Sequence, residues 1–529
     1  MPLTKEIDSN YNVPLVMPRN SAFGELGLPR ILSRLKEEII ELYLSADLPW
    51  IVGYSGGKDS TAVLQLVWLA LAEIPPERRK KIVHVISTDT LVENPVVAAW
   101  VKKSLEVMER EAKARDVPIH PHRLTPHIED SFWTNLVGKG YPAPRHKFRW
   151  CTERLKINPS NAFINRVVKA SGEAILVLGT RKAESSLRAR NMAKHEVHRV
   201  RDRLSPNANL PGSLVYTPIE NWSNDDVWTF LMQVQNPWGY SNKDLLGMYA
   251  GASADGECPL VVDTSTPSCG SSRFGCWVCT LVEKDKSMTA MIQNDEEKEW
   301  MMPLLALRNA LDFRNGGSGD EENSDHHLRD FRRMSGAVQL FHDRPIPGPY
   351  TQAVREDWLR KLLEAQTWIR RHGPADVRNI ELITVEELQE IRRIWVVDKH
   401  ELEDRLPQIY AEATGEPYPG RHLDDNLVLG SETMAELRAL CSGDDLHYQL
   451  TRDLLSVERQ QRAGARRSNL FDQLEKVIRR HFYDDKQDAL ALARRRAAAR
   501  DRPTFDRGNG ATTEDRQVLH LNEPLISDR

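Results

Sequence analysis

The chain has little cysteine, few aromatic residues and no long hydrophobic segment. Six of its 529 residues are cysteines and 7% are aromatic. No apolar run approaches the roughly 20 residues that a bilayer-spanning helix needs. The first residues, which include Pro2, Lys5 and Glu6, lack the basic and then apolar pattern of a signal peptide. We therefore expect a cytoplasmic protein without membrane contact, in which disulfides are not expected.

The chain also lacks a strong excess of either charge. Its 72 basic and 76 acidic residues give a net charge of −4 at pH 7. This balance excludes a global electrostatic attraction to nucleic acid, so any such contact has to be local. Apolar and charged contents of 40% and 28% are typical of a globular protein, and the length suggests two or three domains.

A loop rich in glycine and serine is the most informative feature. It lies between an apolar run at residues 50–54 and an apolar helix expected at residues 61–70, and consists of Ser55, Gly56, Gly57, Lys58, Asp59 and Ser60. A turn from strand to helix points backbone N–H groups and a helix dipole at an anion. Glycines allow close approach and Lys58 adds a positive charge. The common phosphate loop, G-x-x-x-x-G-K-[ST], does not fit, because Asp59 follows Lys58.

Strands and helices alternate through the first half of the chain. We expect strands at residues 50–54, 81–86, 174–178 and 214–218, and helices at residues 30–44 and 95–114. This order predicts an α/β fold with a parallel sheet that binds ligands at the carboxyl ends of its strands. Residues that follow these strands are therefore candidates for ligand binding: Asp89, Gly179, Thr180 and Arg181.

The second half of the chain is predicted to be mainly helical. Thr384 and Glu387 form a capping box that opens one helix, and two others are expected at residues 432–440 and 470–482. A Gly/Ser/Asp-rich stretch at residues 314–327 is typical of a loop or linker. We expect five regions: an N-terminal arm (1–28), an α/β nucleotide-binding domain (29–250), a cysteine segment (251–294), a helical domain (295–500) and a mobile tail (501–529).

Four of the six cysteines lie close together in the sequence. Cys258, Cys269, Cys276 and Cys279 have the spacing C-x10-C-x6-C-x2-C, with prolines and glycines between them. Four thiolates suit either an iron–sulfur cluster or a structural zinc ion, and the spacing leaves both open. Cys441 stands alone in a helical context and is expected in the core.

Two stretches concentrate positive charge. Cys151 is surrounded in sequence by Arg145, His146, Lys147, Arg149, Arg154 and Lys156, and such cations are expected to lower the pKa of a thiol. A second basic stretch, residues 181–203, includes Arg188 and Arg190, which suit phosphate binding. The alternative for the second stretch is a solvated helix face.

The loop and four later segments resemble one branch of the PP-loop ATP pyrophosphatases. The loop is similar to their S-G-G-x-D-S motif. The later segments resemble elements of the phosphoadenosine-phosphosulfate (PAPS) reductases, and they are Asp89-Thr90, residues 149–159, residues 179–188 and residues 218–228. The resemblance covers about residues 45–235. It implies the PP-loop fold and cleavage of ATP between its α and β phosphates. The residues that it implies for ATP binding are Ser55, Gly56, Gly57, Lys58, Asp59, Ser60, Asp89, Gly179 and Thr180.

The cysteine arrangement and the helical extension resemble those of the DndC-type sulfurtransferases of bacterial DNA phosphorothioation. This resemblance implies a [4Fe–4S] cluster on the four clustered cysteines, and ATP and Mg²⁺ as substrate and metal. It also implies DNA, a cysteine desulfurase as sulfur donor and other DNA phosphorothioation subunits as partners. We expect Asp59 and Asp89 to help hold Mg²⁺, and Arg181 to act with Lys58 on the phosphates. Cys151 is expected to carry sulfur as a persulfide. The predicted contacts to DNA phosphate are Arg145, Lys147, Arg149, Arg188 and Arg190.

Other functions remain open at this point. A PAPS or adenylylsulfate reductase would share the motifs, but the iron–sulfur type has a cysteine pair where this chain has Trp150 and Cys151, and the thiol type has a cysteine near its C-terminus. A tRNA thiolase would share the loop and the cluster. A non-catalytic assembly subunit would use nucleotide and cluster only for shape. Cys151 is alternatively a cluster ligand.

Overall fold

The computed structural model describes residues 21–500, apart from residues 147, 201–202, 208, 254–273, 314–324, 342–343, 463–468 and 482. The chain divides into two compact units. The first comprises Met1–Leu328 and Tyr350–Met434, and the second comprises Arg329–Pro349 and Ala435–Arg529. Most of the predicted arm and linker, and the whole predicted tail, lie outside the described residues.

A six-stranded sheet forms the centre of the first unit. Its order is β3-β2-β1-β4-β6-β5, and all neighbouring strands are parallel except the short β5, which runs antiparallel to β6. The strands are β1 (Trp50–Gly53), β2 (Val83–Thr88), β3 (Ile119–Leu124), β4 (Ala174–Val177), β5 (Ser205–Pro206) and β6 (Ser213–Tyr216). The predicted α/β fold is confirmed, and the predicted parallel sheet is confirmed except for the antiparallel β5.

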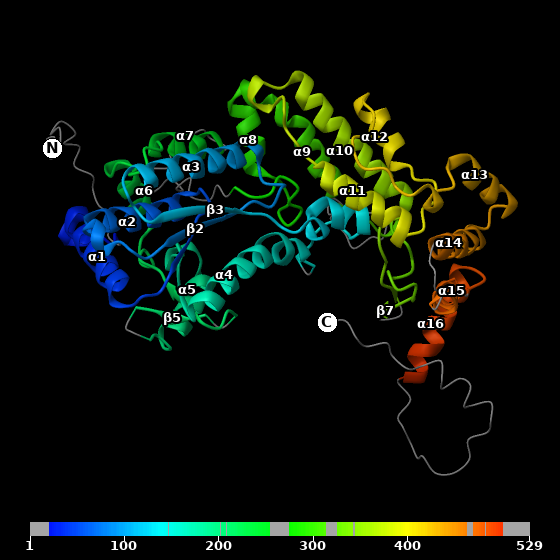
Figure 1. Ribbon diagram of the computed structural model, residues 1–529, viewed down its shortest axis with the longest axis horizontal. Coiled ribbons are helices and arrows are strands. Elements are labelled where there is room, and N and C mark those ends of the chain that lie inside the picture. The colour runs from blue at the N-terminus through cyan, green and yellow to red at the C-terminus, as the bar shows by residue number, and fades with distance from the viewer. Residues whose placement is uncertain are drawn as a thin grey trace, which may run out of the picture. The chain divides into compact units, whose positions relative to one another are not determined.

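Alternate residues of the strands face two separate helical layers (Figure 1). Val52 and Val85 pack into a core with one layer of helices, whereas Ile51 and Leu176 pack into a smaller core with α4. Side chains of a strand alternate between its two faces, so apolar residues at successive positions require cover on both sides. The layer that packs on Val52 and Val85 consists of α1 (Gly27–Ser45), α2 (Lys58–Glu73), α3 (Pro95–Ala114), α6 (Asn224–Gln233) and α7 (Asn242–Gly251). The helix α4 (Asn158–Ser171) covers the opposite face of the sheet.

The sequence analysis missed the edge strand β3. Its sequence includes Pro121, which pairs with Val85 of β2, and Pro118 stands just before it. Proline has no backbone N–H and is tolerated in sheets chiefly at edges, where one side of the strand needs no ladder bond. The edge position therefore explains why a strand forms here despite a weak signal.

Helices that follow the sheet in sequence belong to the same unit. They are α8 (Lys286–Asn294), α9 (Met302–Leu311), α10 (Gln352–His372), α11 (Val385–Arg393) and α12 (Leu406–Thr414). Their core includes Trp133 and Trp395, which lie in or beside π-helical segments. Trp133 Nε1 donates to the Leu382 carbonyl at 2.8 Å, and Trp395 Nε1 donates to the Val137 carbonyl at 3.0 Å. The predicted capping box opens α11, where Thr384 and Glu387 bond to each other's backbone N–H groups.

The second unit is mainly helical. Its elements are the short strands β7 (Leu340–Phe341) and β8 (Arg344–Pro345), and the helices α13 (Ser431–Leu440, which belongs to this unit from Ala435), α14 (Asp445–Arg462), α15 (Leu470–Arg480) and α16 (Lys486–Arg500). Cys441 is buried after α13, as predicted. His481 is buried between Asp453, 2.9 Å from its Nε2, and Arg332, 3.1 Å from its Nδ1. Among the described residues, no helix has the length and apolarity to cross a membrane.

Candidate functional site

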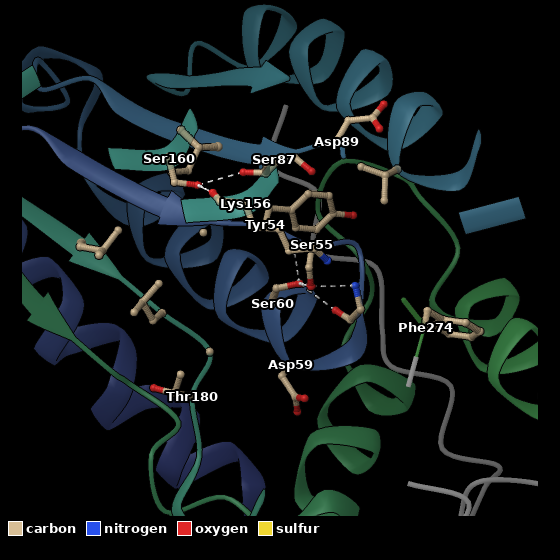
Figure 2. Close-up of a pocket in the computed structure, with 18 of the residues that line it drawn as sticks. Tyr54, Ser55, Asp59, Ser60, Ser87, Asp89, Lys156, Ser160, Thr180 and Phe274 are labelled. Carbon is tan, nitrogen blue, oxygen red and sulfur yellow. Dashed lines mark hydrogen bonds between the residues drawn. The ribbon is translucent and has the colours of Figure 1, made fainter. Parts of the chain in front are cut away.

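The Ser55–Ser60 loop connects β1 to α2 and is held in shape by its own serines. Ser60 Oγ donates to the Gly57 carbonyl at 3.0 Å and accepts from the Ser55 backbone N–H at 3.2 Å. Ser55 Oγ lies 3.1 Å from Ser60 Oγ (Figure 2). Gly56 has a φ of +73°, and a Cβ there would lie 2.4 Å from Val101 of α3. The loop therefore requires glycine for both its conformation and its packing.

Three charged side chains meet beside the loop. Arg181 Nε donates to Asp59 Oδ1 at 2.8 Å, and its Nη1 donates to the Trp222 carbonyl at 3.2 Å. The other oxygen of Asp59 lies 3.5 Å from Lys58 Nζ. Burial lowers the pKa of Lys58 and the Asp59 carboxylate opposes that shift. All three residues were predicted from sequence, and the structure shows that Asp59 joins the two cations.

Gly179 brings the end of β4 against the loop. A Cβ on this glycine would lie 2.9 Å from the carbonyl carbon and oxygen of Asp59 and 3.1 Å from the Ser60 nitrogen. Backbone atoms cannot move as a flexible side chain can, so the close contact requires a residue without a Cβ. Gly179 thereby sets the distance between β4 and the first turn of α2.

Asp59 and Asp89 do not converge. Asp89 accepts two bonds from Arg123, at 2.9 and 2.6 Å, and its other oxygen accepts from the Leu91 N–H at 2.8 Å. Figure 2 shows Asp59 and Asp89 on opposite sides of the loop serines. The two carboxylates therefore do not fit the coordination of one shared Mg²⁺ ion, and we derive no step through that metal. The Mg²⁺ requirement stays a prediction.

A cavity of about 970 Å³ opens at the carboxyl ends of β1, β2 and β4. All the predicted nucleotide-binding residues except Gly56 line it, as does Arg181. Its wall also contains residues that the sequence analysis did not assign to nucleotide binding: Lys156, Ser160, Asn207, Asn209, Tyr249 and Phe274. Lys156 had a sequence signal as a cation near Cys151. Tyr249 and Phe274 belong to none of the motifs, so only the folded chain identifies them.

Cys276 lies beside one end of this cavity. Cys276 Sγ lies 3.3 Å from Thr90 Oγ1 and 3.8 Å from Glu93 Oε1, and Glu93 accepts from Lys156 Nζ at 3.2 Å. Burial raises the pKa of the Cys276 thiol, and Glu93 raises it further. Cys279 follows on a tight turn, in which its N–H donates to the Cys276 carbonyl at 3.0 Å. Lys156 and Glu93 therefore connect the nucleotide cavity with the Cys276–Cys279 turn.

The described half of the predicted cluster site fits a thiolate-bound group. Cys276 and Cys279 are half-buried free thiols on one turn, the geometry of a C-x2-C ligand pair. Cys258 and Cys269 lie outside the described residues. Within the parts of the chain that the structure describes, no group of three or more His, Cys, Asp or Glu side chains is placed to hold a metal ion. Both the four-cysteine site and its cluster stay a prediction.

Cys151 differs from the expectation in its electrostatics. Burial raises the pKa of its thiol, and the nearby Cys279 raises it further, whereas the sequence predicted a lowered pKa. Burial is the largest effect, and the neighbouring cations do not offset it, because three of them have carboxylate partners. Arg145 pairs with Asp325, Arg154 lies 3.4 Å from Asp130, and Lys156 pairs with Glu93. Cys151 itself contacts the core of the helical layer and lies outside the lining of the cavity.

The predicted phosphate-binding cations differ in their availability. Arg149 is exposed and forms no ion pair with described residues, whereas Lys147 lies outside the described residues. Arg188 pairs with Glu184, and Arg190 Nε donates to the Ser186 carbonyl at 3.4 Å. Both arginines lie on α5 (Ser186–Glu196), which has no buried residue. The side chains of this helix are therefore solvated. The helix stands beside the cavity, because Arg188 also lines the cavity.

Comparison with known proteins supports the class of the domain that holds this site. Residues 49–281 match the family model of the phosphoadenosine phosphosulfate reductase domain, so this part of the chain is a PAPS reductase-like domain of the PP-loop superfamily. The match spans less than half of the chain.

Two individual proteins are similar to parts of the chain. The uncharacterized protein MJ0066 of Methanocaldococcus jannaschii is 26% identical over 271 residues, which are 51% of this chain and 44% of that protein. The chain thus matches less than half the length of this relative. A crystal structure of PAPS reductase from Candida auris, in complex with phosphate, is 14% identical and covers 39% of this chain and 86% of that chain, with a TM-score of 0.23.

Proposed function

We propose that this protein is an ATP-dependent sulfurtransferase of DNA backbone phosphorothioation. One observation carries the proposal: the cavity that holds the Ser55–Ser60 loop ends at Lys156 and Glu93, beside Cys276. The Cys151 thiol lies close enough to Cys279 on the Cys276–Cys279 turn for Cys279 to raise its pKa. A nucleotide cavity beside this turn, with Cys151 near the same turn, suits a reaction in which ATP activates a group and sulfur then replaces it. The match to a PAPS reductase-like domain supports a sulfur-transferring or reductase-type activity on a nucleotide.

The loop residues bind and orient the triphosphate. Backbone N–H groups and the serine hydroxyls surround the β and γ phosphates, and the Lys58 ammonium neutralises their charge. Arg181, buried and held by Asp59, provides a fixed guanidinium for the charge that develops at the α phosphate. Its orientation is established before ATP binds, so little reorganisation accompanies the reaction.

The proposed chemistry has two displacements. A non-bridging oxygen of a DNA phosphate attacks the α phosphorus, and the bond to the bridging oxygen of the β phosphate breaks, which releases pyrophosphate. The terminal sulfur of a Cys151 persulfide then attacks the DNA phosphorus, and AMP leaves with the activated oxygen. A dithiol reductant cleaves the remaining S–S bond. That step supplies two electrons, frees the phosphorothioate and returns Cys151 to a thiol.

Partners and cofactor follow from the same proposal. A cysteine desulfurase loads the persulfide, and other DNA phosphorothioation subunits select and open the DNA in the cytoplasm. The exposed Arg149 and the arginines of α5 bind backbone phosphate, a contact that depends on charge and not on base sequence. Cys258, Cys269, Cys276 and Cys279 hold a [4Fe–4S] cluster, which supplies redox or structural chemistry when bound.

A reductase is the second candidate, because the matched family model is that of a reductase domain. Such an enzyme would release sulfite from an adenylylated sulfate and would not need a triphosphate. The two functions differ in their use of ATP.

The purified protein should be incubated with α-labelled ATP, DNA, a cysteine desulfurase with cysteine, and a dithiol, and separately with phosphoadenylyl or adenylyl sulfate and a dithiol. The proposal predicts DNA-dependent formation of AMP and pyrophosphate that Lys58→Met abolishes. Lys103→Met, which removes an exposed lysine of α3 outside the cavity, should leave the rate unchanged. Release of sulfite without any ATP cleavage would replace this proposal with the reductase.

A further inference from the structure

Tyr249 of α7 contacts the phosphate loop with its hydroxyl group. The Lys58 backbone N–H donates to Tyr249 Oη at 3.3 Å, and a Cβ on Gly57 would lie 3.1 Å from the same oxygen. The Lys58 ammonium lies 5.4 Å from the centre of the tyrosine ring. The N-cap of α2, Gly57, offers no side-chain bond to the first turn. The tyrosine hydroxyl is therefore the hydrogen-bond acceptor for an N–H in the first turn of α2, at the nucleotide cavity.

The ring of Tyr249 also contacts the chain next to the cysteine turn. It packs edge-on against Trp228, with centroids 5.2 Å apart, and against Phe274, with centroids 4.8 Å apart. Phe274 stands in the cavity wall (Figure 2), two residues before Cys276. Trp277, just after Cys276, donates its N–H to the Val92 carbonyl at 2.9 Å. Contacts thus run from the loop through Tyr249 to Phe274, and the chain leads from Phe274 to Cys276 two residues later.

We infer that Tyr249 is a positioning residue that couples nucleotide binding to the Cys276–Cys279 turn. The Tyr249 hydroxyl accepts the Lys58 N–H. A phosphate oxygen takes that bond when ATP enters, and the displaced ring shifts Phe274. The inference rests on the proposed function only in requiring that ATP bind the loop. It assigns no role in sulfur or DNA chemistry to Tyr249.

Two physical arguments support the displacement. A charged phosphate oxygen is a stronger hydrogen-bond acceptor than a neutral phenol, so the Lys58 N–H bonds to the phosphate in preference to Tyr249. Tyr249 is only 6% exposed and fits closely between Trp228 and Phe274. In a close-packed interior a ring of this size cannot move without moving its neighbours. Phe274 is the neighbour that leads to the cysteines.

The first test compares ATP affinity in wild type, Tyr249→Phe and Tyr240→Phe by isothermal titration calorimetry. Tyr249→Phe keeps the ring and removes the competing acceptor, so ATP should bind about 2- to 10-fold more tightly, the worth of one neutral hydrogen bond. Tyr240→Phe removes a hydroxyl that bonds the Trp100 carbonyl, and Tyr240 does not line the cavity, so this variant should leave affinity unchanged. Unchanged or weaker binding by Tyr249→Phe would overturn the displacement.

The second test follows the coupling by hydrogen–deuterium exchange of peptides covering residues 274–281, with and without saturating ATP. Exchange in the wild type should change with ATP, and Phe274→Ala should bind ATP while losing that change. Tyr249→Ala provides an independent second variant. The coupling is refuted if ATP leaves exchange in the bound wild type unaltered, or if the change persists in both variants. Neither readout involves DNA or sulfur, so these results can be interpreted even if the protein does not make phosphorothioates. A wild-type protein that does not bind ATP would refute both the proposed function and the coupling through Tyr249.

Discussion

Replacing Gly179 with alanine is expected to damage the nucleotide site by a backbone clash. The new Cβ would lie 2.9 Å from the carbonyl atoms of Asp59 and 3.1 Å from the Ser60 nitrogen. Relief requires β4 and the first turn of α2 to separate by a few tenths of an ångström. Overpacking of this kind costs about 1–3 kcal/mol. If the loop takes up that strain, the ATP dissociation constant rises by about 5- to 150-fold.

The assay is ATP binding by calorimetry, together with circular dichroism to show that the variant is folded. Gly247→Ala is the matched control, because Gly247 lies inside α7 and a Cβ there meets nothing within 4 Å. That variant should bind ATP like the wild type and gain a little stability from the helix propensity of alanine. A folded Gly179→Ala protein with an ATP affinity within twofold of wild type would refute the reasoning.

Three further predictions concern stability, pH and DNA. Trp133→Ala should cost about 3–5 kcal/mol in urea unfolding, since it empties a fully buried site and leaves the Leu382 carbonyl without its donor; a loss below 1 kcal/mol would contradict this. Burial lowers the pKa of His84 to about 4. Between pH 6.5 and 4 the unfolded chain therefore binds a proton that the folded chain does not bind. Thermal stability should fall as the pH falls through that window. His84→Gln should flatten this part of the profile, and an unchanged profile would exclude His84 as the cause. Replacing both Arg188 and Arg190 with alanine should weaken the binding of duplex DNA. It should also reduce the slope of log affinity against log salt by about 0.9 for each DNA phosphate that the protein no longer neutralises. The control Arg110→Ala, on α3, should change neither the affinity nor the slope.

Much of the sheet could be predicted from sequence because its signals are local. Apolar, β-branched runs produced β1, β2 and β4, and the glycines of the loop marked the turn into α2. β3 could not be predicted in this way, because Pro121 obscures its pattern and only an edge position makes it tolerable. Helices were expected at residues 432–440 and 470–482, where α13 and α15 lie, whereas their assignment to a second unit depends on packing.

The functional site depends more strongly than the sheet on contacts between residues that are distant in sequence. The loop, Gly179 and Arg181 carry motif signals, and the structure places them around one cavity. The expected effect of cations on Cys151 was wrong because their carboxylate partners are distant in sequence: Asp325 pairs with Arg145, and Glu93 with Lys156. Tyr249 reaches Lys58 across 191 positions, a contact that no local pattern indicates.

The central claim is best tested by mass spectrometry of phosphorothioate-linked dinucleotides in nuclease-digested DNA. The DNA should come from a deletion strain that carries the wild-type protein, Cys151→Ser or the control Cys441→Ser, with neighbouring genes intact. Our account predicts phosphorothioates with the wild type and with Cys441→Ser, and none with a stably expressed Cys151→Ser protein. Phosphorothioates at the wild-type level with Cys151→Ser would contradict the role of Cys151, and their absence from DNA of the wild-type host would contradict DNA sulfuration itself.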